Sequence, residues 1–243
     1  MRVELKPRFF SEIISIINQL VTEANLKFDK DGLSIIALDP GSVAMVIFEM
    51  PKENFLAYDV TQETIALSLD DLKQVLKRVE KADAIVLEKK ENMLKVSSKD
   101  GIRRSFHLAL INLEEEERKK PSLSFTSLIE MSSDLLKESI EDVSIVADSF
   151  SFISSKKDKS FKIIGRGTLN KSEIEFNEDE IKASLGDDKT AYSVEYFEKF
   201  VKASKIFEKV KISYKTDHPC QLEFFNEGSD IKLTFILAPR IEE

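Results

Sequence analysis

Residues 68–87, SLDDLKQVLKRVEKADAIVL, share their plan with residues 193–212, SVEYFEKFVKASKIFEKVKI. Each stretch opens on a serine, continues with apolar residues at helical spacing and ends in a short apolar run. This pattern predicts an N-capped amphipathic helix that leads into a β-strand. When Leu69 is aligned with Val194, the offset is close to half of the 243 residues. The two halves of the chain are therefore predicted to repeat each other.

A second pair of segments supports the repeat. Residues 10–28 and residues 135–152 both combine a helical pattern with a following strand, and their alignment places Leu26 over Phe150. The same alignment places Phe28 over the last residue of the second segment. Two copies with so long a period are too few for a solenoid, so they predict two similar domains side by side.

Length and composition limit the class of protein. A chain of 243 residues suits one large domain or two of about 120 residues each. Cys220 is the only cysteine and cannot form an internal disulfide, and no apolar run of about 18 residues appears. We therefore expect a soluble, intracellular, cytoplasmic protein. The formal net charge of −8 argues against a general nucleic-acid coat.

The expected fold is α+β, with a linker between two similar domains. Residues 1–113 and 126–243 form the predicted domains, and residues 114–125 form the linker because EEEERKK and Pro121 carry no apolar periodicity. Each domain should hold two helices packed on antiparallel sheets of about eight or nine short strands. Residues 105–113, 173–176 and 221–225 are among the predicted strands, and residues 39–41, 99–101 and 226–228 are predicted turns.

Open antiparallel sheets leave edge strands whose backbone N–H and C=O groups lack partners. Head-to-tail pairing of one subunit with the next would satisfy these groups. Such a contact closes into a ring when the rotation between subunits fits.

Basic residues gather on the two repeated helices, opposite their apolar stripes. Ser68 and Ser193 are the predicted N-caps, and Asp71 completes a capping box in the first copy only. The basic residues are Lys73, Lys77, Arg78 and Lys81 in the first copy and Lys199, Lys202, Lys205 and Lys209 in the second. They could be ordinary solvated faces. Their recurrence in an acidic protein equally predicts salt-sensitive contacts with DNA phosphates, on a surface that the acidic residues 134–148 make mixed.

The sequence contains few candidates for catalysis or metal binding. His107 and His218 are the only histidines, and a zinc site needs about four ligands, so the His218–Cys220 stretch is predicted to be a packing element of a loop. Residues 29–32, DKDG, do not continue as a calcium loop. No phosphate-binding glycine loop or nucleophile elbow appears. We expect no cofactor, no metal and no enzymatic activity.

Two strings resemble the family of proliferating cell nuclear antigen (PCNA). They are residues 32–43, GLSIIALDPGSV, and the C-terminal residues 237–243, LAPRIEE. Lys77 also stands where that family has a DNA-facing lysine. The resemblance covers the whole chain and implies a ring of three subunits whose helices line a hole around duplex DNA. It implies that DNA polymerase, the clamp loader, flap endonuclease and DNA ligase dock on the ring through short peptide motifs.

The resemblance also implies roles for individual residues. Those implied for partner binding are Leu38, Ser42, Val43, Met45, Pro121, Phe125, Pro219, Ile236, Ala238, Pro239 and Ile241. Subunit contacts are implied for residues 103–109 and 171–177, with Arg103, Ser105, Phe106, Leu108, Ile174 and Phe176 as the named positions.

Departures from the family pattern favour an archaeal, DNA-associated clamp. Ser42 replaces a histidine familiar in eukaryotic members, and Ile236 stands where an aromatic residue is common there. The alternatives are a homotrimer and a subunit of a heterotrimeric or damage-response ring. From a different class, an acidic enzyme with a cryptic site would need converging titratable groups that the sequence does not display.

Overall fold

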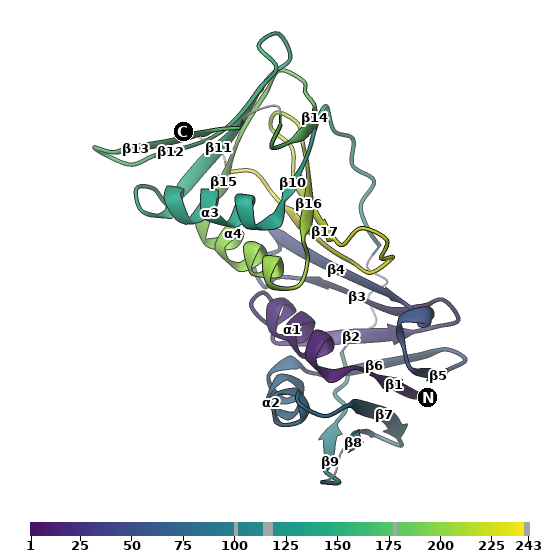
Figure 1. Ribbon diagram of the computed structural model, residues 1–243. Helices are drawn as coiled ribbons and strands as arrows, with labels where there is room; N and C mark the ends of the chain where they lie inside the picture. Colours follow the sequence, from purple (N-terminus) through teal and green to yellow (C-terminus); the bar gives the residue numbers. More distant parts are fainter. Residues whose placement is uncertain (100–101, 114–118, 177–178, 241–243) are drawn as a thin grey trace. The chain divides into compact units, whose positions relative to one another are not determined.

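The computed structural model describes residues 1–99, 102–113, 119–176 and 179–240 (Figure 1). The chain divides into two compact units. The N-terminal unit contains Met1–Pro40, Val46–Lys120 and Asp230–Lys232, and the C-terminal unit contains Gly41–Met45, Pro121–Ser229 and Leu233–Glu243. Across the described residues, each half of the element order has two α-helices and nine strands. The predicted content of two helices and eight or nine strands per half is therefore confirmed.

The strands of the N-terminal unit run in the orders β5-β1-β7-β8-β9 and β6-β2-β3-β4. Its elements are β1 (Arg2–Leu5), α1 (Pro7–Ile17), β2 (Glu23–Phe28), β3 (Gly32–Leu38), β4 (Ala44–Pro51), the 3-10 helix η1 (Lys52–Asn54), β5 (Ala57–Asp59), β6 (Glu63–Ser68), α2 (Leu69–Val79), β7 (Ala84–Lys90), β8 (Met93–Lys99) and β9 (Ser105–Ala109). Strand β9 is shorter than the predicted strand at residues 105–113, because the amide of Ile111 turns to the carbonyl of Ala66 instead of continuing along β8.

The C-terminal unit repeats this plan with the strand orders β13-β12-β11-β15 and β14-β10-β16-β17-β18. Its elements are β10 (Ser127–Ser132), α3 (Ser133–Ser144), β11 (Ser149–Ser155), β12 (Ser160–Arg166), β13 (Lys171–Glu175), β14 (Lys182–Ser184), β15 (Asp188–Ser193), α4 (Val194–Phe200), the 3-10 helix η2 (Val201–Lys205), β16 (Lys209–Tyr214), β17 (Cys220–Phe225) and β18 (Lys232–Leu237).

Backbone pairing between strands aligns the two halves of the chain residue by residue, which the apolar pattern alone does not. The helix N-cap Ser68 lies opposite Glu23, and the N-cap Ser193 lies opposite Ser149. The structure therefore equates Leu26 with Phe152, so the predicted match of Leu26 with Phe150 is wrong by two residues. A shift of two residues keeps the same side chains on the buried face of a strand, which is why alternation alone cannot detect it.

The two repeated helices differ in length. In α2, the Ser68 hydroxyl accepts a hydrogen bond of 3.2 Å from the amide of Asp71, whereas the Ser193 side chain makes no capping bond. Helix α4 ends at Phe200 and the chain continues as the 3-10 turn η2, so the predicted second helix is only partly α-helical. Such tightening is common at helix ends. It moves Lys209 off the predicted helix and onto strand β16.

Both predicted apolar stripes lie in the cores of their units. Leu69, Leu72, Leu76 and Val79 are buried in α2, and Val194, Phe197, Phe200 and Val201 are buried in the second copy. The core of the C-terminal unit is rich in aromatic residues. The rings of Phe150 and Phe197, for example, pack edge to face with their centroids 4.7 Å apart. The helices of each unit lie together, α1 beside α2 and α3 beside α4 (Figure 1).

The predicted turn at residues 226–228 is confirmed, with Gly228 at φ 74° in the left-handed region that favours glycine. The turn at residues 39–41 is also present, and the predicted turn at residues 99–101 falls largely outside the described residues. None of the described helices is both long and apolar enough to cross a membrane.

Candidate functional site

The first basic helix presents its bases away from the core. Lys77, Arg78 and Lys81 are exposed, and across the described ranges no hydrogen bond or ion pair engages their side chains. Lys73 is half-buried and donates a 3.3 Å hydrogen bond to Oδ1 of Asn18 on the neighbouring α1–β2 connection. Three of the four predicted bases of this copy are therefore available to a solvent-side anion.

The second copy holds its bases more tightly. Lys199 pairs with Glu195 at 2.8 Å, and its ammonium lies 5.1 Å from the centroid of the Tyr196 ring. Lys202 and Lys205 are exposed on η2. Lys209, on β16, pairs with Glu130 at 3.5 Å and also with Glu227, and the hydrogen bond that Lys209 donates to Glu227 is the main cause that raises the pKa of Lys209. This lysine is thus the least available of the predicted DNA contacts.

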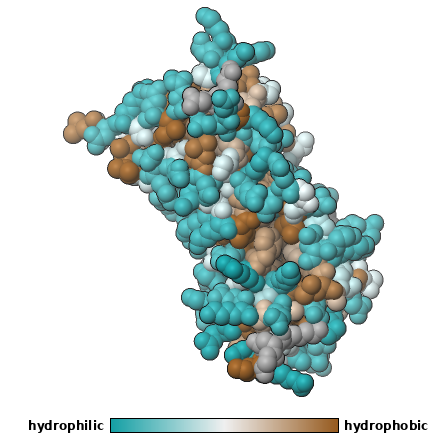
Figure 2. Space-filling view, viewed as in Figure 1, coloured by the Kyte–Doolittle hydropathy of each residue, from teal (hydrophilic) through white to brown (hydrophobic). Residues whose placement is uncertain are grey.

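Acidic residues share the helical surface. Asp134, Glu138, Glu141 and Asp142 of α3 are exposed, and Lys137 pairs with Glu141 at 3.7 Å. The view that displays the helices in Figure 1 shows a mostly hydrophilic face in Figure 2. The surface is therefore mixed in charge, as the sequence predicted.

Strands β9 and β13 each form the edge of a sheet. Just beyond β9 the amide of Leu110 donates to the carbonyl of Asn92, and just beyond β13 the amide of Phe176 donates to the carbonyl of Phe161. Because backbone N–H groups alternate in direction along a strand, the odd-numbered residues turn theirs to the open edge. These residues are Ser105, His107 and Ala109 in β9 and Lys171, Glu173 and Glu175 in β13. Sequence reasoning identified the strands but not this alternation.

Most of the side chains predicted for the subunit contact belong to the even-numbered residues, whose N–H groups bond inward, and these side chains are half-buried or buried. Phe106, Leu108 and Ile174 are half-buried, and Phe176 is buried with its ring stacked 5.4 Å from that of Phe161. Arg103 and Ser105 are exposed. The backbone of the alternate residues, together with their charged side chains, is therefore what these edges offer to a partner.

Charged and apolar side chains border the two edges. On β13, Glu173 and Glu175 lie 3.2 and 3.1 Å from the ammonium of Lys162, whose pKa these hydrogen bonds raise, with the bond to Glu175 contributing most. Ile102 and Leu169, in the turns that lead into β9 and β13, are 63% and 94% exposed.

The C-terminal unit also contains an apolar surface built on its tail. The amide of Ala238 donates to the carbonyl of Val43 at 2.9 Å, and the amide of Arg240 donates to that of Ala191 at 2.8 Å. Val43 is 40% exposed, whereas Ile236 is buried. The remaining predicted partner-binding residues of this unit are exposed or half-buried; they are Ser42, Met45, Pro121, Phe125, Pro219, Ala238 and Pro239. Leu38 is half-buried in the N-terminal unit, and Ile241 lies outside the described residues.

A buried carboxylate that sequence reasoning missed lies behind this surface. Asp188, 7% exposed, accepts hydrogen bonds from the hydroxyls of Ser127 and Thr126 at 2.6 and 2.7 Å and from the amide and hydroxyl of Thr216, both at 3.1 Å. Burial by itself raises the pKa of Asp188, but the hydrogen bonds from these three residues outweigh it and lower that pKa below its ordinary value. Asp188 is therefore ionised and fully bonded.

Residues 5–117 match the family model of the proliferating cell nuclear antigen N-terminal domain, and residues 119–240 match that of its C-terminal domain. The chain belongs to the PCNA family.

Relatives and solved structures agree with this assignment. The DNA polymerase sliding clamp of Thermococcus gammatolerans is 35% identical to this PCNA-family chain over 242 residues, which cover 96% of the chain and 95% of the relative. PCNA from A. fulgidus, solved with the C-terminal region of FEN-1, has a TM-score of 0.89 at 28% identity and covers 100% of this chain and 99% of its own. The PCNA2-PCNA3 complex of Sulfolobus tokodaii gives 0.88 at 27% identity, with full coverage of both chains.

The predictions of a PCNA relative, of an α+β fold with two similar clamp domains and of a DNA sliding clamp are confirmed. PCNA-family clamps are processivity factors, not catalysts. Among the described residues, no group of three or more His, Cys, Asp and Glu side chains is placed to hold a metal ion.

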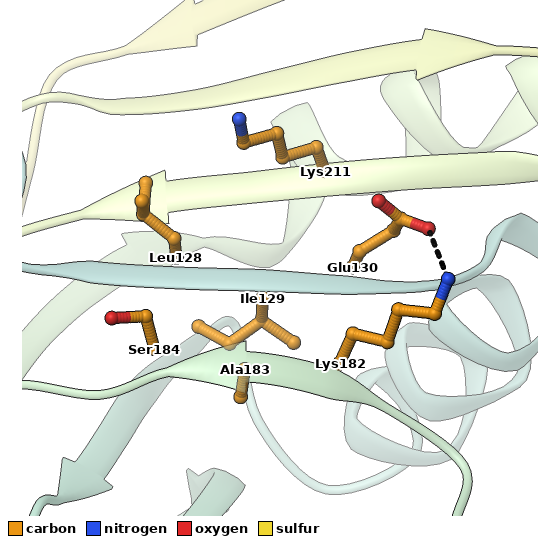
Figure 3. A pocket seen from close by; sticks show the side chains of 7 residues that line it. All are labelled: Leu128, Ile129, Glu130, Lys182, Ala183, Ser184 and Lys211. Carbon is orange, nitrogen blue, oxygen red and sulfur yellow. Dashed lines mark ion pairs between the residues drawn. The ribbon is translucent and has the colours of Figure 1, made fainter.

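A hollow of this PCNA-family chain lies beside Lys209, because Glu130, which pairs with Lys209, contributes to its lining. It has a volume of about 260 Å³ and lies over β10, β14 and β16 (Figure 3). Its lining residues are Leu128, Ile129, Glu130, Lys182, Ala183, Ser184 and Lys211. Lys182 pairs with Glu130 at 3.7 Å across its floor. The hollow is open to solvent and its lining carries two lysines and one glutamate, and we assign it no role in clamp function.

The ionised Asp188 makes the stability of the C-terminal unit depend on pH. Because its folded-state pKa is lowered, its contribution is complete above the unfolded-state value of about 3.9 and is lost as the pH falls through the folded-state value. Asp188→Asn should cost about 1–3 kcal/mol near neutral pH, and less as the pH falls towards about 3. Urea unfolding of both proteins across this range measures the difference. A constant difference at every pH would contradict the assignment.

Proposed function

We propose that this chain assembles as a ring of three subunits that encircles duplex DNA, slides along it and tethers replication and repair proteins without catalysing a reaction itself. The observation that carries the proposal is the pair of open edges, β9 in one unit and β13 in the other. Pairing of β9 with β13 of a second copy joins different surfaces of the same chain. Such heterologous contacts generate closed rings when the rotation fits.

The side-chain alternation of the two strands favours a particular antiparallel register. When Leu108 lies opposite Ile174, Phe106 lies opposite Phe176, and both apolar pairs fall on the same side of the joined sheet. The same register sets His107 opposite Glu175, and both residues carry an edge-directed N–H group. Apolar and polar faces thus continue from one subunit into the next. The PCNA2-PCNA3 complex from Sulfolobus tokodaii supports contact between two clamp chains.

The same complex, which joins two different clamp chains, supports a second candidate assembly, a ring of different subunits. A chain that is monomeric alone but joins a ring with a second clamp subunit would still perform sliding-clamp work. The edges β9 and β13 would then pair with β13 and β9 of that other subunit.

The proposed DNA contact is loose and electrostatic. The exposed bases of α2 and η2 supply phosphate contacts, and the interspersed acids of α3 weaken them. Weak, sequence-independent attraction is what a sliding ring requires, because strong contacts would stop its movement. Lys73, Lys199 and Lys209 are half-buried and bond to Asn18, Glu195 and Glu130, so they would contribute less.

Reversing two bases tests this contact. Lys77→Glu with Lys202→Glu should weaken DNA association. It should also make the slope of log K against log salt concentration shallower by the equivalent of roughly one or two phosphate contacts, since each contact contributes about 0.9 to that slope. DNA affinity measured as a function of salt concentration gives this slope. The matched control is Lys27→Glu with Lys211→Glu, which changes the net charge equally at exposed strand positions. Equal slopes for the two double variants would contradict the assignment.

Partner docking is assigned to the tail surface, defined as Val43, Met45, Phe125, Pro219, Ala238 and Pro239. A. fulgidus PCNA was solved with the C-terminal region of FEN-1, which supports flap endonuclease as a partner here. Polymerase, ligase and the clamp loader would bind in the same way, each burying the apolar side chains of a short peptide against the tail surface. Buried aromatic residues usually dominate such interfaces.

A further inference from the structure

Strand β15 holds two chain segments that lie far apart in the sequence. Its Ala191 carbonyl accepts from the tail amide of Arg240 at 2.8 Å. Its Thr190 hydroxyl donates to the carbonyl of Lys215 at 3.0 Å, and its Tyr192 hydroxyl donates to the carbonyl of His218 at 3.1 Å. The tail and the loop that leads to Pro219 are therefore fixed to one rigid strand of the C-terminal unit.

Asp188, the first residue of β15, completes this arrangement. Its Oδ2 atom accepts from Thr126, which directly follows Phe125, and from Ser127. Its Oδ1 atom accepts from the amide and hydroxyl of Thr216 in the loop before Pro219. One carboxylate thus joins the end of the interdomain linker to that loop.

The bonds of Asp188 are local to these two segments. Ser127 is held further by the amide of Gly186 at 2.9 Å and by the hydroxyl of Ser154 at 2.8 Å, so β10 stays in place when a single bond is removed. Thr126, by contrast, is exposed, as is Thr216 on the other side of the carboxylate. The Thr126 hydroxyl bond to Asp188 and the 3.3 Å bond from the Thr126 amide to the carbonyl of Tyr214 define where the linker ends.

We propose that Asp188 is a positioning residue for partner docking: by bonding Thr126 and Thr216 together, it sets the separation of Phe125 and Pro219 on the tail surface. It does not touch the docked peptide. The proposal rests on the proposed docking function and adds to it the buried group that pre-organises the apolar surface. A pre-organised surface binds more tightly because less ordering remains to be done when the peptide arrives.

Two isosteric variants test the proposal in the full chain. Thr126→Val removes only the linker bond. Thr216→Val removes the bond from the hydroxyl to Asp188 and the 3.2 Å bond that the hydroxyl accepts from the Lys189 amide, while the bond from the Thr216 amide to Asp188 remains. The probe is a synthetic peptide of the FEN-1 C-terminal region, and the measurement is its dissociation constant by calorimetry. Each variant should bind roughly three- to tenfold more weakly, and Asp188→Asn, which keeps the shape and an acceptor oxygen, should lose less than Asp188→Ala.

The control variant is Ile140→Val, which loosens the buried core at α3 without touching the cluster. It should lower the unfolding temperature and leave peptide affinity unchanged. Hydrogen exchange gives a second readout, since Asp188→Ala should speed amide exchange at residues 126 and 215–218 and not in α3.

The outcomes separate the two claims. If the wild type does not bind the peptide, the proposed docking function fails. If the wild type binds and the Thr126→Val, Thr216→Val and Asp188→Ala variants bind equally well, docking stands and the positioning role of Asp188 is wrong. Equal weakening by Ile140→Val would also overturn that role, because the effect would then follow general stability.

Discussion

Glu173→Pro should dissociate the ring into single subunits while both units of the chain stay folded. Glu173 is the central residue of the edge strand β13, and its N–H group points away from β12. Proline removes this donor, and its pyrrolidine side chain occupies the space that the strand of the neighbouring subunit must enter. A strand edge tolerates proline only where no other strand pairs with it. We expect each subunit contact to weaken by roughly 100-fold or more. Sedimentation at micromolar concentration, together with circular dichroism, measures mass and fold.

Two further variants separate the causes. Glu173→Ala removes the carboxylate and its ion pairs with Lys162 and Lys171 but keeps the N–H group, so it should remain trimeric. Ile174→Pro removes an amide that bonds inward to β12, so it should lower the unfolding temperature as well. A Glu173→Pro protein that keeps its mass would show that this edge is not the subunit contact.

Val43→Glu should abolish peptide docking without changing the mass of the ring. Val43 is 40% exposed and its carbonyl holds the tail through Ala238, so its side chain lies within the apolar tail surface. When the apolar part of a docking peptide covers this surface, a carboxylate there would be buried without a partner. This burial costs about 2 kcal/mol or more, which lowers the affinity at least roughly thirtyfold. Calorimetry with the FEN-1 C-terminal peptide and polymerase stimulation on primed DNA measure the loss.

Leu56→Glu is the matched control, because Leu56 is an aliphatic residue of similar exposure on the N-terminal unit. It should bind the peptide like the wild type. A chain truncated after Leu237 should behave like Val43→Glu, since it lacks the tail residues. Full polymerase stimulation by either Val43→Glu or the truncated chain would move the principal docking site elsewhere.

The sequence predicted those parts of the fold that depend on local periodicity. The apolar stripes of α2 and α4, the N-cap at Ser68 and the edge strands follow from spacings of a few residues, and the structure bears them out. The match of Leu26 with Phe150 was wrong because a two-residue slip leaves strand alternation unchanged. Lys209 was misplaced because helical periodicity does not show where α4 tightens into η2.

The candidate site was predictable only in part. The tail residues and Val43 were identified through the resemblance to PCNA, but the direction of each edge N–H group depends on ladder register, which no single strand encodes. Asp188 was missed for a similar reason. Its partners Ser127 and Thr216 are 61 and 28 residues away in the sequence, so no local pattern marks it. Sequence periodicity therefore indicates faces, and the long-range bonds that organise those faces require the structure.

Topological retention on DNA tests the central claim most directly. The purified clamp is loaded onto nicked circular DNA by a clamp loader, crosslinking is omitted, and the DNA is then linearised with a restriction enzyme before gel filtration. A closed ring that slides should stay with the circular DNA at high salt and run off the linear DNA. Equal retention on both forms, or release from both at high salt, would contradict a ring that encircles DNA.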